Sequence, residues 1–431
     1  MVNPRMGLHL RTRPGHPDFL DLEWDRPLDE WEGDRLVEVA RGQHRHVVRF
    51  VAYDEGLYAL KELPPRIATR EHAMLRRMAD ESLPVVDVAG IVNRQQMRVP
   101  AGPLEDVLIT RYLDYSLPYR ALFTHRRPTP ESADELGHLH ERLLDALAML
   151  LVRIHLLGFY WGDCSLSNTL FRRDAGALAA YIVDLETGEY HPTLSDGQRA
   201  EDLEITQVNV AGGLMDLQAE LELPPEPDPV ETAERLGERY DLLWQELTTE
   251  ELIGPDERYK IDARLRRLNE LGFAVDELEL LSTEGGDALR LRTAVTEQGH
   301  HRRRLLSLTG LQAQENQARS VLNDLANYRA AVERELGRQL PETVAAHRWL
   351  SEVYEPIVAA VPEELWTKLE AVELFHQVIE HKWFLSERKG RDVGVLEAMD
   401  SFLSDVLPTV PDERSVLADE HDAAVDWIGF G

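Results

Sequence analysis

The sequence contains a single cysteine, Cys164, among 431 residues. One cysteine cannot form an intramolecular disulfide, and such sparse use of cysteine is typical of a reducing compartment. We therefore expect a cytoplasmic protein. No His and Asp pattern around Cys164 supports nucleophilic chemistry, so we interpret it as a buried loop residue.

Long apolar runs are absent as well. No window approaches the eighteen or so uninterrupted apolar residues that a membrane-spanning helix requires. The first nineteen residues carry several arginines but no continuous apolar core of the kind that a secretory signal needs. We expect a chain without a membrane span.

Basic residues are fewer than acidic residues. The chain has 47 Lys and Arg against 78 Asp and Glu, a formal net charge of -31, and such a field repels nucleic acid and anionic membranes. We therefore expect no nucleic-acid partner. The exception is the basic run from His300 to Arg304. It fits a site for phosphate, nucleic acid or an acidic face of the same chain, and equally a solvated hairpin end whose arginines pair with nearby glutamates.

The length predicts more than one domain, and a composition of 43% hydrophobic and 29% charged residues is near the globular average. The segment LPPEPDP has four prolines in seven residues, which marks a domain boundary. We predict an N-terminal extension at 1–30, a first domain at 31–224, a Pro-rich linker at 225–229, a second domain at 230–411 and an acidic tail at 412–431.

Residue patterns predict an α+β protein. In the first domain, alternation over 35–61 predicts a three-stranded meander, and Thr69 is the predicted N-cap of the next helix, after Pro64 and Pro65 end the last strand. Apolar spacing predicts a long helix over 136–154 that stops at Gly158. Further expected elements are strands at 85–92, 107–112, 169–172 and 179–184, a helix at 200–222, a helix at 230–251, strands within 275–308, and mostly helices from 311 to 407.

A set of polar residues follows the long helix and a later strand. Asp163 and Asn168 lie in the loop G-D-C-S-L-S-N with four residues between them, and the strand Y-I-V-D ends on Asp184. This spacing matches the D-x-x-x-x-N of kinase catalytic loops. Phosphoryl transfer from ATP needs a carboxylate beside the attacking hydroxyl and metal ions on the phosphates. We therefore predict Asp163 as the base and Asn168 with Asp184 as ligands of Mg²⁺.

A lysine occupies a matching place upstream. Lys61 ends a predicted strand in Y-A-L-K, with Ala59 on the same face, much like the V-A-I-K of kinases. Glu71, in the first turn of the predicted helix, would pair with Lys61 and aim its ammonium at the phosphates. Glu81 is a second candidate for that pairing.

The runs TREHAMLRRMADESLPVVDVAG, GFYWGDCSLSNTLF and YIVDLE resemble the compact kinase-like family that includes lipopolysaccharide kinases and the RIO and Bud32 atypical kinases. The resemblance covers about 35–223. It implies a two-lobed protein-kinase-like domain that uses ATP and Mg²⁺, with Asp163 and Lys61 catalytic. It also implies a nucleotide site; the residues implied there are Lys61, Glu71, Gly42, Ala59 and Tyr112.

The later runs EQGHHRRRLLSLTGLQAQENQARSVLND and FHQVIEHKWFLSERKGRDVG are similar to a domain of unknown function found beside kinase-like domains in actinobacterial proteins. This similarity implies one two-domain architecture and supplies no chemistry. The expected fold is therefore a two-lobed protein-kinase-like domain followed by a mixed, mainly helical C-terminal domain.

Two functions stay open at this stage. Retention of every metal ligand favours an ATP-dependent phosphotransferase that acts on a hydroxyl of an unidentified substrate. Three departures from the family pattern favour a pseudokinase or an ATP-hydrolysing scaffold that presents the C-terminal domain to a protein partner. Trp161 stands where relatives have His, Leu185 and Glu186 follow Asp184 where many kinases have Phe and Gly, and Gly42 is the only glycine in ARGQHRH.

Overall fold

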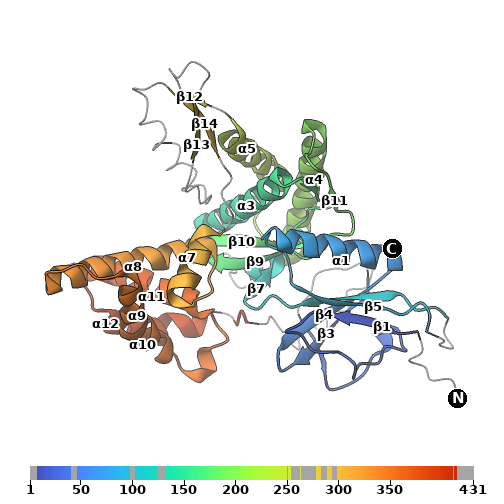
Figure 1. Cartoon of the computed structure of the whole chain (residues 1–431), viewed down its shortest axis with the longest axis horizontal. Helices are drawn as coiled ribbons and strands as arrows, with labels where there is room; N and C mark the ends of the chain where they lie inside the picture. The colour runs from blue at the N-terminus through green and yellow to red at the C-terminus, as the bar shows by residue number, and fades with distance from the viewer. Residues whose placement is uncertain are drawn as a thin grey trace.

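The computed structural model shows a two-lobed unit followed in the chain by a bundle of helices (Figure 1). We call residues 7–248 the first unit and residues 299–414 the C-terminal unit. None of the described helices combines the length and the apolar character needed to cross a membrane. The structure describes residues 7–39, 46–97, 102–124, 133–249, 251–253, 263, 278–282, 289–293, 299–410 and 412–414.

The first lobe, here the sheet lobe, is an antiparallel sheet in the order β1-β5-β6-β4-β3-β2. The meander expected over 35–61 is present as β2, β3 and β4, with its hairpin turn at Asp54 and Glu55. The expected N-terminal extension adds strand β1, which pairs with β5. The strands are β1 (His9–Thr12), β2 (Leu36–Val37), β3 (Val48–Tyr53), β4 (Gly56–Leu63), β5 (Val88–Asn93) and β6 (Asp106–Arg111), with a short 3-10 turn at Leu28–Glu30.

One helix, α1 (Pro65–Asp80), packs on this sheet (Figure 1). The prediction that Thr69 caps the helix is wrong. The helix begins at Pro65, because proline has the right φ for the first helical position and needs no partner for an N–H there. The Thr69 hydroxyl instead donates to the Pro65 carbonyl at 2.9 Å. Glu71 therefore lies in the second turn rather than the first, on the buried face.

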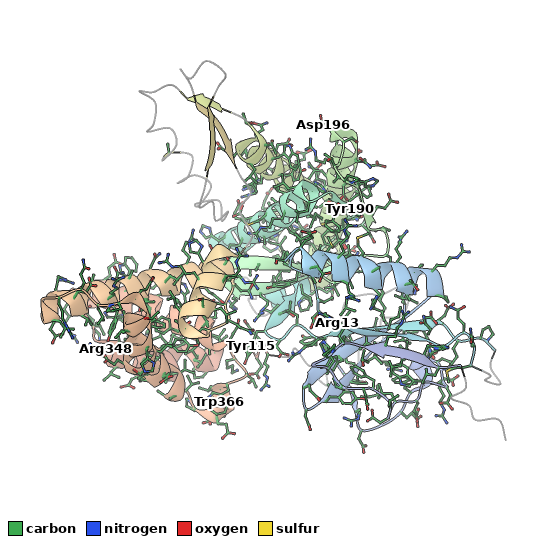
Figure 2. All side chains as sticks on the ribbon, in the orientation of Figure 1. Arg13, Tyr115, Tyr190, Asp196, Arg348 and Trp366 are labelled. Atoms are coloured by element: carbon green, nitrogen blue, oxygen red, sulfur yellow. The ribbon has the colours of Figure 1, made fainter. Side chains whose placement is uncertain are left out.

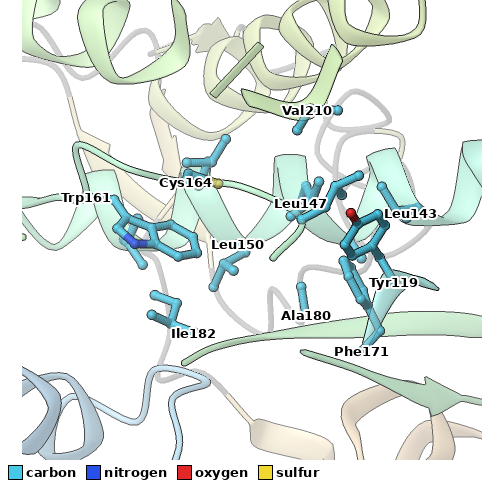
Figure 3. Packing of buried hydrophobic residues seen from close by; sticks show 14 of the residues in the cluster. Tyr119, Leu143, Leu147, Leu150, Trp161, Cys164, Phe171, Ala180, Ile182 and Val210 are labelled. Atoms are coloured by element: carbon cyan, nitrogen blue, oxygen red, sulfur yellow. The ribbon is translucent and has the colours of Figure 1, made fainter. Parts of the chain in front are cut away.

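The second lobe, here the helical lobe, contains α3, helix α5 packed on α3, and helix α4 packed on α5. Leu143, Leu147 and Leu150 of α3 point into a core that also contains Phe171 and Ile182 of the small sheet (Figure 3). The elements are β7 (Ser116–Pro118), α2 (Tyr119–Thr124), α3 (Ala133–Leu156), β8 (Phe159–Tyr160), β9 (Thr169–Asp174), β10 (Ala177–Ile182), β11 (Glu189–Tyr190), α4 (Asp196–Leu221) and α5 (Pro229–Thr248).

Helix α5 belongs to the core of the first unit, although the sequence assigned it to the second domain. Leu236, Tyr240 and Leu243 are buried in the same cluster as the residues of α3. The Pro-rich segment is a turn between two packed helices, and the side chain of Asp228 caps α5 by accepting from the amides of its first turn. Prolines mark a chain reversal here, and burial of the apolar face of α5 places it with the first unit.

The C-terminal unit is a helical bundle around Trp349 and Phe375, whose rings meet edge to face. The interpretation of His300 to Arg304 as a hairpin end is wrong, because these residues begin helix α7. Arg304 pairs with Glu342 of the same unit. The elements are α7 (His300–Thr309), α8 (Glu315–Leu336), α9 (Glu342–Trp349), α10 (Glu355–Ala359), α11 (Ala371–Lys389) and α12 (Val395–Ser401). Between the units the described residues form a sheet of β12 (Glu251–Ile253), β14 (Leu289–Thr293) and β13 (Leu278–Ser282).

Candidate active site

Lys61 and Glu71 meet between the sheet and helix α1. Lys61 lies on β4, and its Nζ is 3.3 and 3.4 Å from the two carboxylate oxygens of Glu71. The Glu71 side chain is fully buried. The structure therefore brings together the pair that the sequence proposed, and a buried carboxylate keeps the ammonium in place.

Asp184 reaches the same lysine from the helical lobe, two residues after the end of β10. Its Oδ2 lies 2.6 Å from Lys61 Nζ. Glu186 also contacts Lys61, at 3.3 Å, and its Oε1 is 2.7 Å from Nε2 of His46. Glu71, Asp184 and Glu186 offer ligand atoms within 4.8 Å of one another, so they form a group that could hold a metal ion.

Burial and charge shift the pKa values of this cluster. Burial would lower the pKa of the Lys61 ammonium, but the negative charges of Glu71 and Asp184 outweigh burial and raise it. Burial, with repulsion from Asp184, raises the pKa of Glu71 to about 7 against the attraction of Lys61. Lys61 is thus a permanent cation at neutral pH.

The loop after α3 fixes Asp163 through two side-chain amides. Asn168 Nδ2 donates to Asp163 Oδ2 at 3.2 Å and to its carbonyl at 3.0 Å. Asn209, from helix α4, donates to Asp163 Oδ1 at 3.1 Å and to the carbonyl of Cys164. Each carboxylate oxygen keeps a lone pair, so Asp163 is oriented and still able to accept a proton.

Trp161 connects this loop to Asp184. Its indole Nε1 donates to the Asp184 carbonyl at 2.9 Å, and its ring packs beside Leu150 and Ile182 (Figure 3). Next to this contact the amide of Val183 donates to the carbonyl of Asn168 at 3.1 Å. The segments that carry Asn168 and Asp184 therefore run side by side, as the sequence proposed.

Asp202 of α4 is a residue that the sequence analysis missed. Its buried carboxylate accepts from the amide of Trp161 at 2.7 Å and the amide of Gly162 at 2.8 Å, and it contacts Nε2 of His155 at 3.0 Å. Gly162 has φ +75°, and a Cβ there would lie 2.8 Å from the ring of Tyr160. The available signal was the seven-residue spacing of Asp202 and Asn209, which places both on one face of a helix.

Two residues of the implied nucleotide site, Ala59 and Tyr112, lie on or directly after neighbouring strands. Ala59 on β4 is opposite Phe50 of β3. Tyr112 follows β6, donates its amide to Leu57, and has its ring edge-on to Phe50 with the centroids 6.1 Å apart. The proposed Gly42 lies outside the described residues.

The donor set fits magnesium. Mg²⁺ prefers carboxylate and amide oxygens, and it keeps several water ligands beside one or two protein ligands. Asn168 turns its Nδ2 toward Asp163, which leaves its Oδ1 as a ligand. Cys164, as expected, is a buried loop residue and not part of this set; burial raises the pKa of its thiol well above the usual value.

A sheet lobe with one helix, a helical lobe, and a lysine that faces an acidic residue beside an Asp–Asn loop together define a protein-kinase-like domain. The comparison with family models agrees: residues 45–209 match the lipopolysaccharide kinase (Kdo/WaaP) family, and residues 242–407 match a domain of unknown function, DUF4032. The chain therefore joins a region that matches the Kdo/WaaP kinase family model to a region that matches the DUF4032 model, which confirms the resemblance seen in the sequence. This match supports a kinase-like phosphotransferase.

Three solved structures illustrate the likeness. WaaP in complex with acyl carrier protein has 16% identity and a TM-score of 0.30, over 48% of this chain and 89% of that one. The yeast RNA Pol II CTD kinase CTDK-1 complex has 16% identity and a TM-score of 0.26, over 38% and 49%. The BubR1 kinase domain has 14% identity and a TM-score of 0.27, over 40% and 53%. No curated protein matched the chain.

Proposed function

We propose that the chain is an ATP-dependent phosphotransferase that moves the γ-phosphoryl group of ATP to a hydroxyl of an unidentified acceptor. The observation that carries the proposal is the contact of 2.6 Å between Lys61 Nζ and Asp184 Oδ2. It joins the two lobes at the point where the phosphates of ATP would lie. The Asp163 loop is connected to the same place through Trp161.

Asp163 is the proposed general base. The amides of Asn168 and Asn209 orient its carboxylate. As the acceptor oxygen forms its bond to the γ-phosphorus, Asp163 takes the hydroxyl proton, and the bond to the bridging oxygen of ADP breaks. A carboxylate held in this way needs little reorganisation when the acceptor binds.

Asn168 and Asp184 are the residues that would hold Mg²⁺. When bound, the ion would neutralise charge on the phosphates. Lys61 would contribute a second positive charge, and Glu71 would hold its ammonium toward the phosphates. Ala59 and Tyr112 would lie against the adenine, beside Phe50.

One observation favours the alternative of a nucleotide-binding scaffold. Glu186, at a position where many kinases have glycine, binds both Lys61 and His46. A carboxylate in this place competes with phosphate oxygens for the lysine. Under this alternative the chain would bind or hydrolyse ATP and present its C-terminal unit to a protein partner.

Incubation of the purified full chain with Mg²⁺ and ATP labelled on the γ-phosphate separates these functions. A phosphotransferase yields ADP together with label on an added hydroxyl acceptor or on the protein itself. Release of labelled inorganic phosphate alone would indicate hydrolysis. A rise in melting temperature with Mg²⁺ and ATP, without ADP, would indicate the scaffold.

A further inference from the structure

The small sheet of the helical lobe has the strand order β10-β9-β7. Both proposed metal-binding residues lie just beyond one end of its β9–β10 hairpin. Strand β9 begins one residue after Asn168, and β10 ends two residues before Asp184. The two strands pair from Thr169 opposite Ile182 to Asp174 opposite Ala177. At about 3.3 Å per residue, the turn of this hairpin lies nearly 20 Å from the metal-binding end.

The turn of the hairpin is bound by the C-terminal unit. Asp174 is 4% exposed. Its Oδ1 accepts from the backbone amide of Gln317 at 2.8 Å, and its Oδ2 accepts from Nδ2 of Asn316 at 3.0 Å. The side chain of Gln317 donates to the carbonyl of Arg173 at 3.0 Å. The start of helix α8 thus binds the last residues of β9 directly.

A second buried carboxylate completes this contact from helix α11. Glu373 Oε2 accepts from the amide of Ala175 at 3.1 Å and from Nε2 of Gln317 at 2.7 Å. Ala175 has φ +50°, a left-handed conformation that costs energy for a residue with a Cβ. The bond from its amide to Glu373 stabilises this conformation.

Two tyrosines of the helical lobe also bind the C-terminal unit. The hydroxyl of Tyr181 on β10 donates to Oε1 of Gln314 at 2.6 Å in a buried position. Before β7, Tyr115 donates its amide to the carbonyl of Arg414 and its hydroxyl to the carbonyl of Trp366, both at 3.1 Å; Tyr115 and Trp366 are labelled in Figure 2.

Ion pairs of the same sheet reach the end of the described chain. Arg172 binds Glu370 at 2.7 Å, and Arg173 binds Glu413. Glu413 is 2% exposed, so this part of the predicted acidic tail belongs to the packed structure.

These contacts describe a permanent junction. Buried carboxylates and amides that lose their partners cost free energy, because water cannot replace the lost hydrogen bonds inside a packed interior. Separation of the two units would leave the buried polar groups of Asp174, Glu373 and Gln317 without hydrogen-bond partners. The two units therefore form one body around the sheet.

We propose that the C-terminal unit positions the two metal-binding residues of the phosphotransfer site through the β9–β10 hairpin, with Asp174 and Tyr181 as the positioning residues. The expected effect on catalysis rests on the proposed phosphotransferase function. Its structural part is that contacts with the C-terminal unit order the metal-binding end of the hairpin. This part follows from the contacts and does not depend on the proposed function.

The test uses the full chain with Asp174→Ala, and with the milder Tyr181→Phe in case Asp174→Ala folds poorly. The matched controls are Asp324→Ala and Tyr328→Phe. Asp324 accepts from Trp349 and Tyr328 donates to Glu352, so both bonds stay within the C-terminal unit. The first readout is the Mg²⁺ concentration that gives half-maximal turnover of ATP, recorded with kcat at a temperature where all variants are folded.

The second readout needs no activity. It is the hydrogen exchange of the Val183 amide, which donates to Asn168 at the metal-binding end. We expect the junction variants to raise the half-saturating Mg²⁺ concentration and to speed this exchange. The expected size is about 2-fold to 30-fold, the range that residues along a coupling network produce. The controls should change both values by less than about 2-fold.

Exchange at Val183 that matches the controls would overturn the proposal, and so would faster exchange with an unchanged Mg²⁺ requirement in an active enzyme. If the unmodified chain binds no ATP, the proposed function fails. In that case the exchange result alone decides whether the junction orders the hairpin.

Discussion

The indole nitrogen of Trp161 donates a hydrogen bond of 2.9 Å to the backbone carbonyl of Asp184. Two segments that lie twenty-three residues apart are thereby joined at the centre of the site. Trp161 replaces the histidine expected from the family pattern. Because its ring is buried in the core of the helical lobe, the replacement gives the loop an apolar anchor as well as a donor.

Trp161→Phe keeps an aromatic side chain, but it removes the donor and part of the buried ring volume. We expect the free energy of unfolding to fall by about 2 kcal/mol, because one buried hydrogen bond is lost and a small cavity is left. We expect turnover to fall by up to about 10²-fold, because the loop and Asp184 lose their alignment. Denaturant unfolding and steady-state kinetics measure these effects. Trp24→Phe is the control, since Trp24 donates its Nε1 to the Phe19 carbonyl far from the site; equal losses of turnover in both variants would argue against the role of Trp161.

Asp202→Asn tests the residue that holds the backbone of the loop. An amide offers one acceptor oxygen where the carboxylate offers two, and its NH₂ group would face a backbone N–H. We expect the free energy of unfolding to fall by about 3 kcal/mol and turnover to fall with it. The control is Asp216→Asn, an exposed residue on the same helix. Turnover equal to that of the unmodified chain would show that Asp202 does not set the loop.

Asp174→Asn tests the buried carboxylate at the hairpin turn. Burial raises the pKa of Asp174 to about 6, against the lowering effect of the bond from the Gln317 amide. The folded state therefore binds more protons than the unfolded state between about pH 4 and 6, so this group makes stability fall as pH rises through that window. The stability of the unmodified chain relative to Asp174→Asn should fall by about 1 kcal/mol from pH 5 to pH 7.

Urea unfolding at the two pH values measures this change. The control is Asp216→Asn, an exposed position that leaves the Asp174 carboxyl in place. A parallel pH dependence of the unmodified chain and Asp174→Asn would contradict the assignment.

The sequence predicted those parts of the site that depend on patterns of neighbouring residues. A strand that ends near a lysine, a loop after a long helix and a carboxylate after a strand each have a short-range signature. Asp163 and Asn168 lie, as expected, in the loop that follows the long helix. Lys61 and Asp184 were expected to end their strands, but Lys61 lies two residues before the end of β4 and Asp184 two residues after the end of β10. The strand and helix patterns predicted the α+β class, and the family resemblance implied the two lobes.

Other features depend on contacts between distant segments and have no local signature. Asp202 and Asn209 act on a loop about forty residues earlier, and helix α5 joins the first unit only because its apolar face fits α3 and α4. From the sequence alone, Glu71 could equally be explained as an exposed glutamate early in a helix, which complements the helix dipole. Its complete burial against Lys61 distinguishes the two interpretations.

The most direct measurement is the single-turnover rate of Asp163→Ala with Mg²⁺ and γ-labelled ATP, together with ATP affinity. The account predicts that the rate falls by about 10²-fold to 10⁴-fold. It also predicts that ATP affinity stays nearly unchanged, because Asp163 acts on the acceptor hydroxyl and not on ATP. Asp216→Ala should retain both values. An unchanged rate of phosphoryl transfer in Asp163→Ala would contradict the account.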